Sequence, residues 1–345
     1  MLTPHPRGTT LVEVLVGVVI GLIVAVGILD AFAGTELRRR NTVGLAEADA
    51  AGTLATFVLG SELANAGYGI TAAAADLDGC PDTADPRTTL RPIPVLITAG
   101  ANAQAPDAIT VNYAAAPALA GTVTLAQAAS AGDPLRVQAP LGFAAGDTIV
   151  AIAPGGRCAS TIIGSVSAPY PDGTIALSRT DANEGFPAST RVFNRGPLAT
   201  AARLRYDVAA GALRSQDLNT PDASPNPIVS GVVHFKAQYG IDSDGDGYLD
   251  AWVGADTAPW RASEVLAMPA SALARIKAIR FGFVVRSDAW DPAVTSSAEW
   301  VMFDCPSSDK ARCPGRLAGT LPAQSRYRVL EAMIPLRNAI RSDGS

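Results

Sequence analysis

The chain has 345 residues, of which 48% are hydrophobic and only 17% charged, and its formal net charge is −5. This length allows one large domain or two small ones beside an N-terminal segment. The acidic balance provides no basic field that would attract nucleic acid, so we expect no nucleic-acid partner. With 32 glycines and 25 prolines, the composition favours short strands and turns over helical bundles.

An apolar run near the N-terminus is long enough to cross a membrane. No charged residue occurs between Val14 and Leu29, and Leu11 and Val12 extend the run to nearly twenty residues. Glu13 lies near its start, where an unpaired carboxylate is costly. A secretory signal peptide has its small-residue cleavage site after the apolar run. Here the distinctive residues come before it, in a short leader, MLTPHPRG.

These residues resemble the N-termini of type IV prepilins and of the related pseudopilins of type II secretion. In that family a short leader ends in glycine, is cut on the cytoplasmic side, and leaves glutamate as the fifth residue of the mature chain. Gly8, Thr9 and Glu13 occupy those positions, and the resemblance covers roughly the first 35 residues. One departure is Thr9, where phenylalanine is the commonest residue of the family.

The resemblance implies a role for each of the three residues. A prepilin peptidase would cut between Gly8 and Thr9, the new amine would be methylated, and Glu13 would pair with the amine of a neighbouring subunit. The alternative for Glu13 is a carboxylate that reaches the membrane interface by itself.

Charges on the two sides of the apolar run give conflicting indications of topology. Arg7 precedes it, whereas Arg38, Arg39 and Arg40 follow it. We give the cleavage motif precedence. It implies a single-pass inner-membrane protein with a periplasmic head, which later reaches the pilus and the cell surface.

The helical spacing of apolar residues continues beyond the membrane run as far as Leu63. It predicts one helix from Thr9 to Asn65, about 85 Å long, that ends at Gly67 or Gly69. We therefore expect a leader at 1–8, a long helix at 9–67 with a membrane span at about 11–33, and a β-rich head at 68–345.

From Tyr68 onwards, proline and glycine interrupt the chain too often for long helices. Short apolar runs between turns predict strands, and the segment 219–227 reads as a turn-rich loop within the head. The fold class is α+β, with a long N-terminal helix packed on an antiparallel sheet. The expected strands are 94–98, 108–113, 147–152, 161–166, 173–177, 232–239 and 276–286.

The late part of the chain resembles the PilW-type minor pilins. The segment from Tyr327 to Asn338 is similar to their closing strand. The segments before it also occur in the same order as in that family: an aspartate-rich loop, a tryptophan-containing stretch and then the strand at 276–286. The resemblance implies a type IV pilin-like fold. It also implies that the partners are other major and minor pilins, together with the inner membrane before assembly.

Four cysteines occur without any CxxC pair, which disfavours zinc and thioredoxin-like sites. We expect two disulfides, Cys80 with Cys158 and Cys305 with Cys313, in an oxidising compartment. The alternative is four buried, unpaired thiols.

The segment IDSDGDGYLDAW contains the strongest candidate metal site. Asp242, Asp244, Asp246 and Asp250 have the spacing of a calcium loop, in which the carbonyl of Tyr248 is a further ligand. Val253 takes the place of the usual twelfth-position glutamate, so Asp256 or water would have to complete the shell, and we expect weak binding. The alternative is a solvated acidic turn.

Evidence for catalysis is thin. Of two histidines, His5 lies in the leader, and His234 shares a strand face with Lys236 and Gln238 as a solvated or packed residue. No nucleophile elbow, phosphate loop or zincin motif occurs, and we expect no enzyme. The expected function is a minor pilin of a type IV pilus, in an initiating or tip complex that serves biogenesis, adhesion or motility. The alternatives are a type II secretion pseudopilin and a membrane-anchored calcium-binding or adhesive domain that never polymerises.

Overall fold

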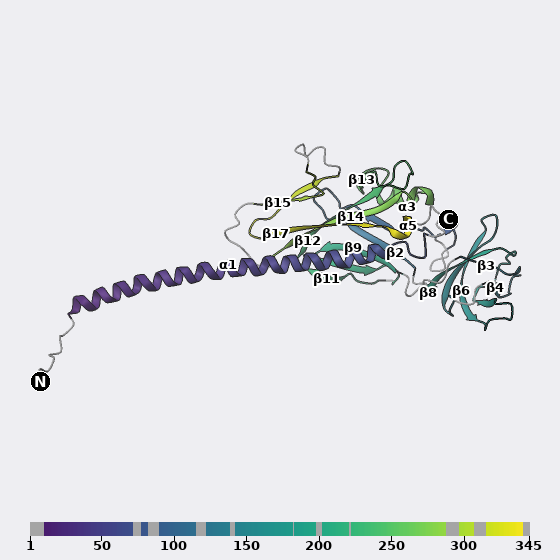
Figure 1. Ribbon diagram of the computed structural model, residues 1–345, viewed down its shortest axis with the longest axis horizontal. Helices are drawn as coiled ribbons and strands as arrows, with labels where there is room; N and C mark the ends of the chain where they lie inside the picture. The colour runs from purple at the N-terminus through teal and green to yellow at the C-terminus, as the bar shows by residue number, and fades with distance from the viewer. Residues whose placement is uncertain are drawn as a thin grey trace, which may run out of the picture.

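The molecule is elongated, with one helix projecting far beyond a β-rich head (Figure 1). A computed structural model describes residues 10–71, 77–81, 90–114, 122–138, 142–181, 183–197, 202–220, 222–287, 297–306 and 315–340. The start of the helix and the strands β3, β4 and β6 lie at opposite ends of the molecule.

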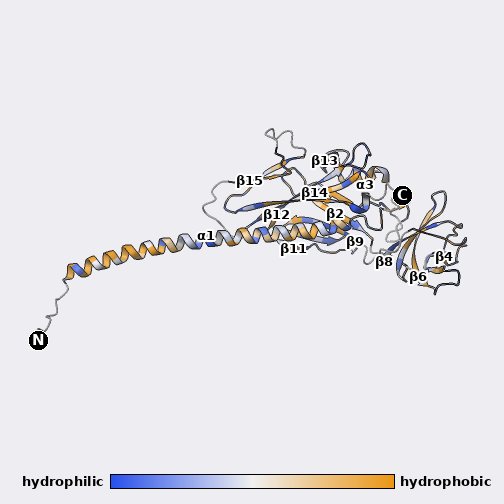
Figure 2. Ribbon diagram, viewed as in Figure 1, coloured by the Kyte–Doolittle hydropathy of each residue, from blue (hydrophilic) through white to orange (hydrophobic). Residues whose placement is uncertain are grey.

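Helix α1 spans Leu11–Asn65, about 80 Å of regular helix, in agreement with the apolar periodicity. It begins with a capping box, in which the Thr10 side chain accepts the backbone N–H of Glu13 and the Glu13 carboxylate accepts that of Thr10. Its first half is predominantly hydrophobic (Figure 2), with no charged residue between Val14 and Leu29. A helix of this kind needs an apolar surrounding.

The second half of α1 packs on the head through one face, with Ala48, Ala55 and Leu59 buried. Gly52 lies on the same face, where a Cβ atom would come within 2.3 Å of the Leu330 side chain. Glycine at this position therefore allows the helix to approach β17 (Tyr327–Pro335) closely. The helix end is capped from the far end of the chain, since the side-chain amide of Asn338 donates to the carbonyls of Asn65 and Ala66. These contacts satisfy carbonyls that a helix end leaves free.

Two antiparallel sheets and α1 form the main body of the head. The five-stranded sheet has the order β1-β2-β9-β10-β11 and the four-stranded sheet the order β13-β12-β14-β17. The strands of the first sheet are β1 (Val95–Thr98), β2 (Ala108–Tyr113), β9 (Ala202–Ala209), β10 (Ala212–Asp217) and β11 (Asn226–Ser230). Those of the second are β12 (Val232–Ile241), β13 (Ala251–Gly254), β14 (Ile276–Arg286) and β17 (Tyr327–Pro335).

The core of the body lies between these sheets and α1. Its largest fully buried side chains include Tyr239, Phe235 and Phe281. The Tyr239 hydroxyl also accepts the backbone N–H of Ile97, so it joins β12 to β1 across the core. Burial of so much aromatic surface is the main stabilising contribution in this part of the molecule.

A hairpin covers the outer face of the four-stranded sheet. It consists of β15 (Ala298–Met302) and β16 (Leu317–Leu321), and Trp300 and Met302 pack on Val284 in a second, smaller core. The described part of the body also contains the short helices α3 (Ala262–Ala267), α4 (Ala270–Leu273) and α5 (Arg337–Ile340).

The remaining strands form a separate barrel, which lies between β2 and β9 along the chain. Their order is β3-β8-β5-β6-β7-β4, and a bridge between Leu125 and Val137 brings the two edges together. The barrel has its own core, which includes Leu135, Ile149 and Leu177. The strands are β3 (Val123–Thr124), β4 (Leu135–Val137), β5 (Asp147–Ile152), β6 (Cys158–Val166), β7 (Ile175–Arg179) and β8 (Arg191–Pro197).

The long N-terminal helix followed by antiparallel sheets is the fold class expected from the sequence. The expected strands fall close to β1, β2, β5, β6, β7, β12 and β14, whereas the loop expected at 219–227 already includes the start of β11. We expected one β-rich head at 68–345. The structure instead distributes its strands over a main body and a barrel with separate cores.

Candidate functional site

The first candidate site is the N-terminal half of α1. Every described side chain from Thr10 to Phe32 is exposed, including large ones such as Leu11 and Ile23. The stretch Leu11–Glu36 is long and apolar enough to cross a membrane, as is Thr42–Asn65, which packs partly on the head. So large an apolar surface requires lipid or other protein around it.

Glu13 lies at the start of this apolar surface. In the single chain its carboxylate accepts hydrogen bonds from the backbone N–H and hydroxyl of Thr10, at 3.1 and 3.4 Å. Both contacts are local and exposed, so they leave room for a charged partner from another molecule. Gly8 and Thr9, the expected cleavage site, lie outside the described residues.

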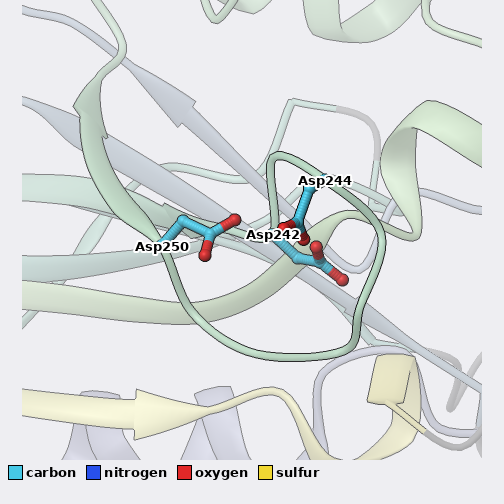
Figure 3. Close-up of side chains that lie close together, drawn as sticks. All are labelled: Asp242, Asp244 and Asp250. Atoms are coloured by element: carbon cyan, nitrogen blue, oxygen red, sulfur yellow. The ribbon is translucent and has the colours of Figure 1, made fainter.

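The second candidate site is the acidic loop between β12 and β13. Ligand oxygens of Asp242, Asp244 and Asp250 all lie within 4.8 Å of one another, and Figure 3 shows their side chains gathered on one loop. The loop is closed at its base, where the N–H of Asp250 donates to the carbonyl of Ile241. Asp246 is not in this group of carboxylates, and its Oδ1 accepts the N–H of Tyr248.

Internal hydrogen bonds already organise the acidic loop. Asp242 is buried and accepts the backbone N–H groups of Gly245 and Gly247, while Asp250 accepts both the N–H and the hydroxyl of Ser243. Burial opposes ionisation of Asp242, but these donors and the charge of Lys277 hold its pKa below the usual range. Hydrogen bonds from Ser243 likewise lower the pKa of Asp250. Both groups are therefore ionised at neutral pH.

The fit of this loop to a cation is partial. Three carboxylates at short separation are a donor set that suits calcium. The Lys277 ammonium, however, lies 3.8 Å from Asp242 and already offsets part of the negative charge. Nothing in the sequence indicated this lysine as a neighbour of Asp242. It belongs to β14, which follows α3 and α4 along the chain.

The structure joins Cys80 to Cys158 by a disulfide, which is the first of the two expected pairs. Cys305 is also disulfide-bonded, and Cys313 lies outside the described residues.

An ion pair that is buried in the body was not predicted from the sequence. Lys236 donates to Asp107 at 2.9 Å, and both side chains line a cavity of about 260 Å³. These two residues are 129 positions apart, and each occurs in an unremarkable sequence context. His234, which was expected to be solvated or packed, is packed against Trp300.

Part of the head is similar to a known protein family. Residues 205–338 match the family described as PilW, type IV pilus-assembly protein W. The match begins within β9 and ends within α5, so it includes neither α1 nor the barrel. The PilW resemblance seen in the sequence is confirmed for these residues.

Among solved structures, a type IV-like pilin from Thermus thermophilus aligns with 84% of this chain and 96% of its own, at 14% sequence identity and a TM-score of 0.30. The search of curated proteins finds no match.

Proposed function

We propose that this chain is a minor pilin, a structural subunit that enters a type IV pilus through α1 and acts in its initiating or tip complex. The observation that carries the proposal is the exposed apolar half of α1, which projects from a head whose residues 205–338 match a pilus-assembly family. Before assembly the helix holds the protein in the inner membrane as a single span, with the head in the periplasm. After assembly it lies among the helices of other pilins.

The surface of α1 supports close packing with other helices. Gly17 and Gly21 form a GxxxG pair, and nothing lies within 4 Å of the position of a Cβ atom at either residue. Small residues at this spacing allow two helices to approach closely in a lipid environment. Beyond the membrane run, Val43, Leu54 and Phe57 remain exposed on the side away from the head. Apolar contact surface is therefore available along most of the helix.

Glu13 supplies the charge that directs assembly. In the single chain it is bonded only to Thr10 among the described residues. Cleavage after Gly8 creates a cation at Thr9. Between neighbouring subunits, pairing of this amine with Glu13 removes two uncompensated charges from an apolar surrounding, whereas a missing partner leaves one behind.

The experiment compares processing and incorporation in cells. We expect a mature chain that begins at Thr9 with a methylated amine, detected by intact mass in cells that contain the prepilin peptidase and absent without it. The Glu13→Val variant should still be cut but enter pili several-fold less, because the amine then has no partner. Glu47→Val removes an exposed glutamate from the second half of the same helix and should leave incorporation unchanged.

Two outcomes would contradict the proposal. An N-terminus at Met1 with and without the peptidase would show that the chain is not a prepilin. Equal incorporation of Glu13→Val and wild type would show that the carboxylate has no role in assembly.

A further inference from the structure

The barrel is inserted into the five-stranded sheet at a single point. β2 ends at Tyr113 and β9 begins at Ala202, and these two residues are register partners in adjacent antiparallel strands. The chain therefore leaves the sheet, forms β3 to β8, and returns to the position from which it left. The barrel core and the core of the body share no residue among the described side chains.

The barrel also lies at the end of the molecule opposite the start of α1 (Figure 1). If α1 is held by a membrane or a filament, as proposed above, the barrel is the part that extends furthest from that anchor. A pull on the barrel must then be transmitted through the head to α1.

Along the backbone, this force would pass through the strands that precede the barrel. After α1 the chain enters β1 and then β2, which lies between β1 and β9. Ile109 and Val111 of β2 are fully buried in the core of the body. Tension applied at the end of β2 would therefore act on the hydrogen bonds of β2 to both neighbouring strands and on its packing in the core of the body.

The disulfide provides a shorter covalent connection. Cys80 belongs to the segment between α1 and β1, and Cys158 is the first residue of β6 in the barrel. The same contact is reinforced by packing, because Leu77 and Leu90 lie against Val150 and Phe193 on the barrel. A path from Asn65 to Cys80 and across the disulfide reaches the barrel without passing through β1 or β2.

We propose that the Cys80–Cys158 disulfide is a tether that carries pulling force from the barrel to α1 and protects β1 and β2 from being drawn out of the sheet. The barrel can then be pulled without unfolding the body. The proposal rests on the proposed function only for the anchoring of α1.

Single-molecule extension of the full chain in detergent tests the tether. One handle is attached through a clickable residue at Ser61, which is exposed near the end of α1. The other is attached in the turn at Gly155 and Gly156, where nothing lies within 4 Å of a Cβ position. The oxidised chain is held at constant force, and a phosphine reductant is then added.

We expect little extension before reduction, followed by a release of up to about 270 Å, the extended length of the 78 residues that the disulfide separates. Cys80→Ser with Cys158→Ser should release this length without reductant. The matched variant Cys305→Ser with Cys313→Ser keeps the tether and should behave as wild type.

A stable length after complete reduction would overturn the proposal, because the sheet would then carry the force alone. Release of the same length from the oxidised chain would overturn it as well. The measurement needs no filament, so its failure is distinguishable from failure of the Glu13 experiment.

Discussion

Three polar side chains on the outer face of β12 are buried, and each is accommodated differently. Lys236 pairs with Asp107, and Gln238 accepts from Arg280 and donates to the carbonyl of Gly315. His234 has no such partner among the described residues: its Nε2 is buried without a hydrogen bond. Its ring instead packs against Trp300, with 4.6 Å between ring centroids.

Replacing His234 by phenylalanine should remove a pH dependence of stability. Burial, aided by the charge of Lys236, lowers the pKa of His234 to about 4. In the unfolded chain the pKa is about 6.5, so the unfolded state binds more protons between these values. The stabilising effect of the neutral ring is complete above pH 6.5 and is lost as the pH falls towards 4, by about 3 kcal/mol in total.

The measurement is urea unfolding of the full chain in detergent at pH 7.5 and pH 4.5, for wild type and for His234→Phe. At pH 7.5 we expect similar free energies of unfolding, because the phenyl ring keeps the contact with Trp300. At pH 4.5 the variant should be the more stable of the two. An equal loss of stability in both proteins between pH 7.5 and pH 4.5 would show that His234 binds a proton in the folded chain as readily as in the unfolded chain.

The burial of these side chains could not be predicted from β12 alone. Alternation of apolar and polar residues correctly placed His234, Lys236 and Gln238 on one face. What covers that face comes from remote parts of the chain, namely Asp107 before β2 and Trp300 in β15. Local pattern determines which residues share a face, whereas burial depends on contacts that are distant in sequence.

Helix α1 was predictable because its sequence signals are local. A capping box at Thr10 and Glu13 starts it, apolar periodicity extends it, and Gly67, with a φ of +79°, follows its end. The acidic loop was equally visible, because its spacing is contained in nine residues. Its charge balance was not, because Lys277 reaches Asp242 from another strand.

Two interpretations of the acidic loop can be distinguished by experiment: a calcium site, and a turn that its own hydrogen bonds stabilise without metal. We propose that the loop binds one calcium ion weakly, with Kd in the range of roughly 10⁻⁴ to 10⁻³ M. Bound calcium should raise the Tm of the full chain by mass action. Asp244→Ala with Asp246→Ala should abolish the rise. Lys277→Met should enlarge it, since it removes a cation that lies 3.8 Å from Asp242.

Calorimetry and thermal melting with calcium, with magnesium and with chelator check this prediction. Asp217→Ala with Asp222→Ala removes two acidic residues elsewhere in the head and serves as the matched control. If millimolar calcium leaves the Tm of the wild type unchanged, the hydrogen bonds from Gly245, Gly247 and Ser243 are sufficient to hold the loop, and no metal is required.

The division of the molecule into body and barrel could not be predicted from the sequence. Strands of both parts, such as β5 and β12, are short apolar runs between turns and look alike in the sequence. The body and the barrel are distinguished by the pairing of Tyr113 in β2 with Ala202 in β9, two residues that the whole barrel separates along the chain. Such pairing over a long sequence distance leaves no local signature.

The same pairing predicts that the body folds without the barrel. Residues 115–200 are replaced by Asn-Gly, a turn that joins adjacent antiparallel strands, which continues the β2–β9 ladder beyond Tyr113 and Ala202. Cys80→Ser, Leu77→Ser and Leu90→Ser remove the thiol and the apolar side chains that the barrel would otherwise cover. Because no barrel residue belongs to the core of the body among the described side chains, we expect one cooperative thermal transition. Its Tm should lie within a few degrees of that of the body in the wild-type chain.

Scanning calorimetry of the full chain and of the excised variant, both in detergent, measures this transition. A second excision that joins Ile109 directly to the same Asn-Gly turn deletes Val111, which is fully buried in β2. It should lose the cooperative transition. The cavity and the broken β2–β9 ladder together reduce the free energy of unfolding by about as much as the whole stability of a marginally stable domain. Loss of the transition in the first variant as well would mean that the body needs the barrel in order to fold, and that the two cores are separate in space but not in stability.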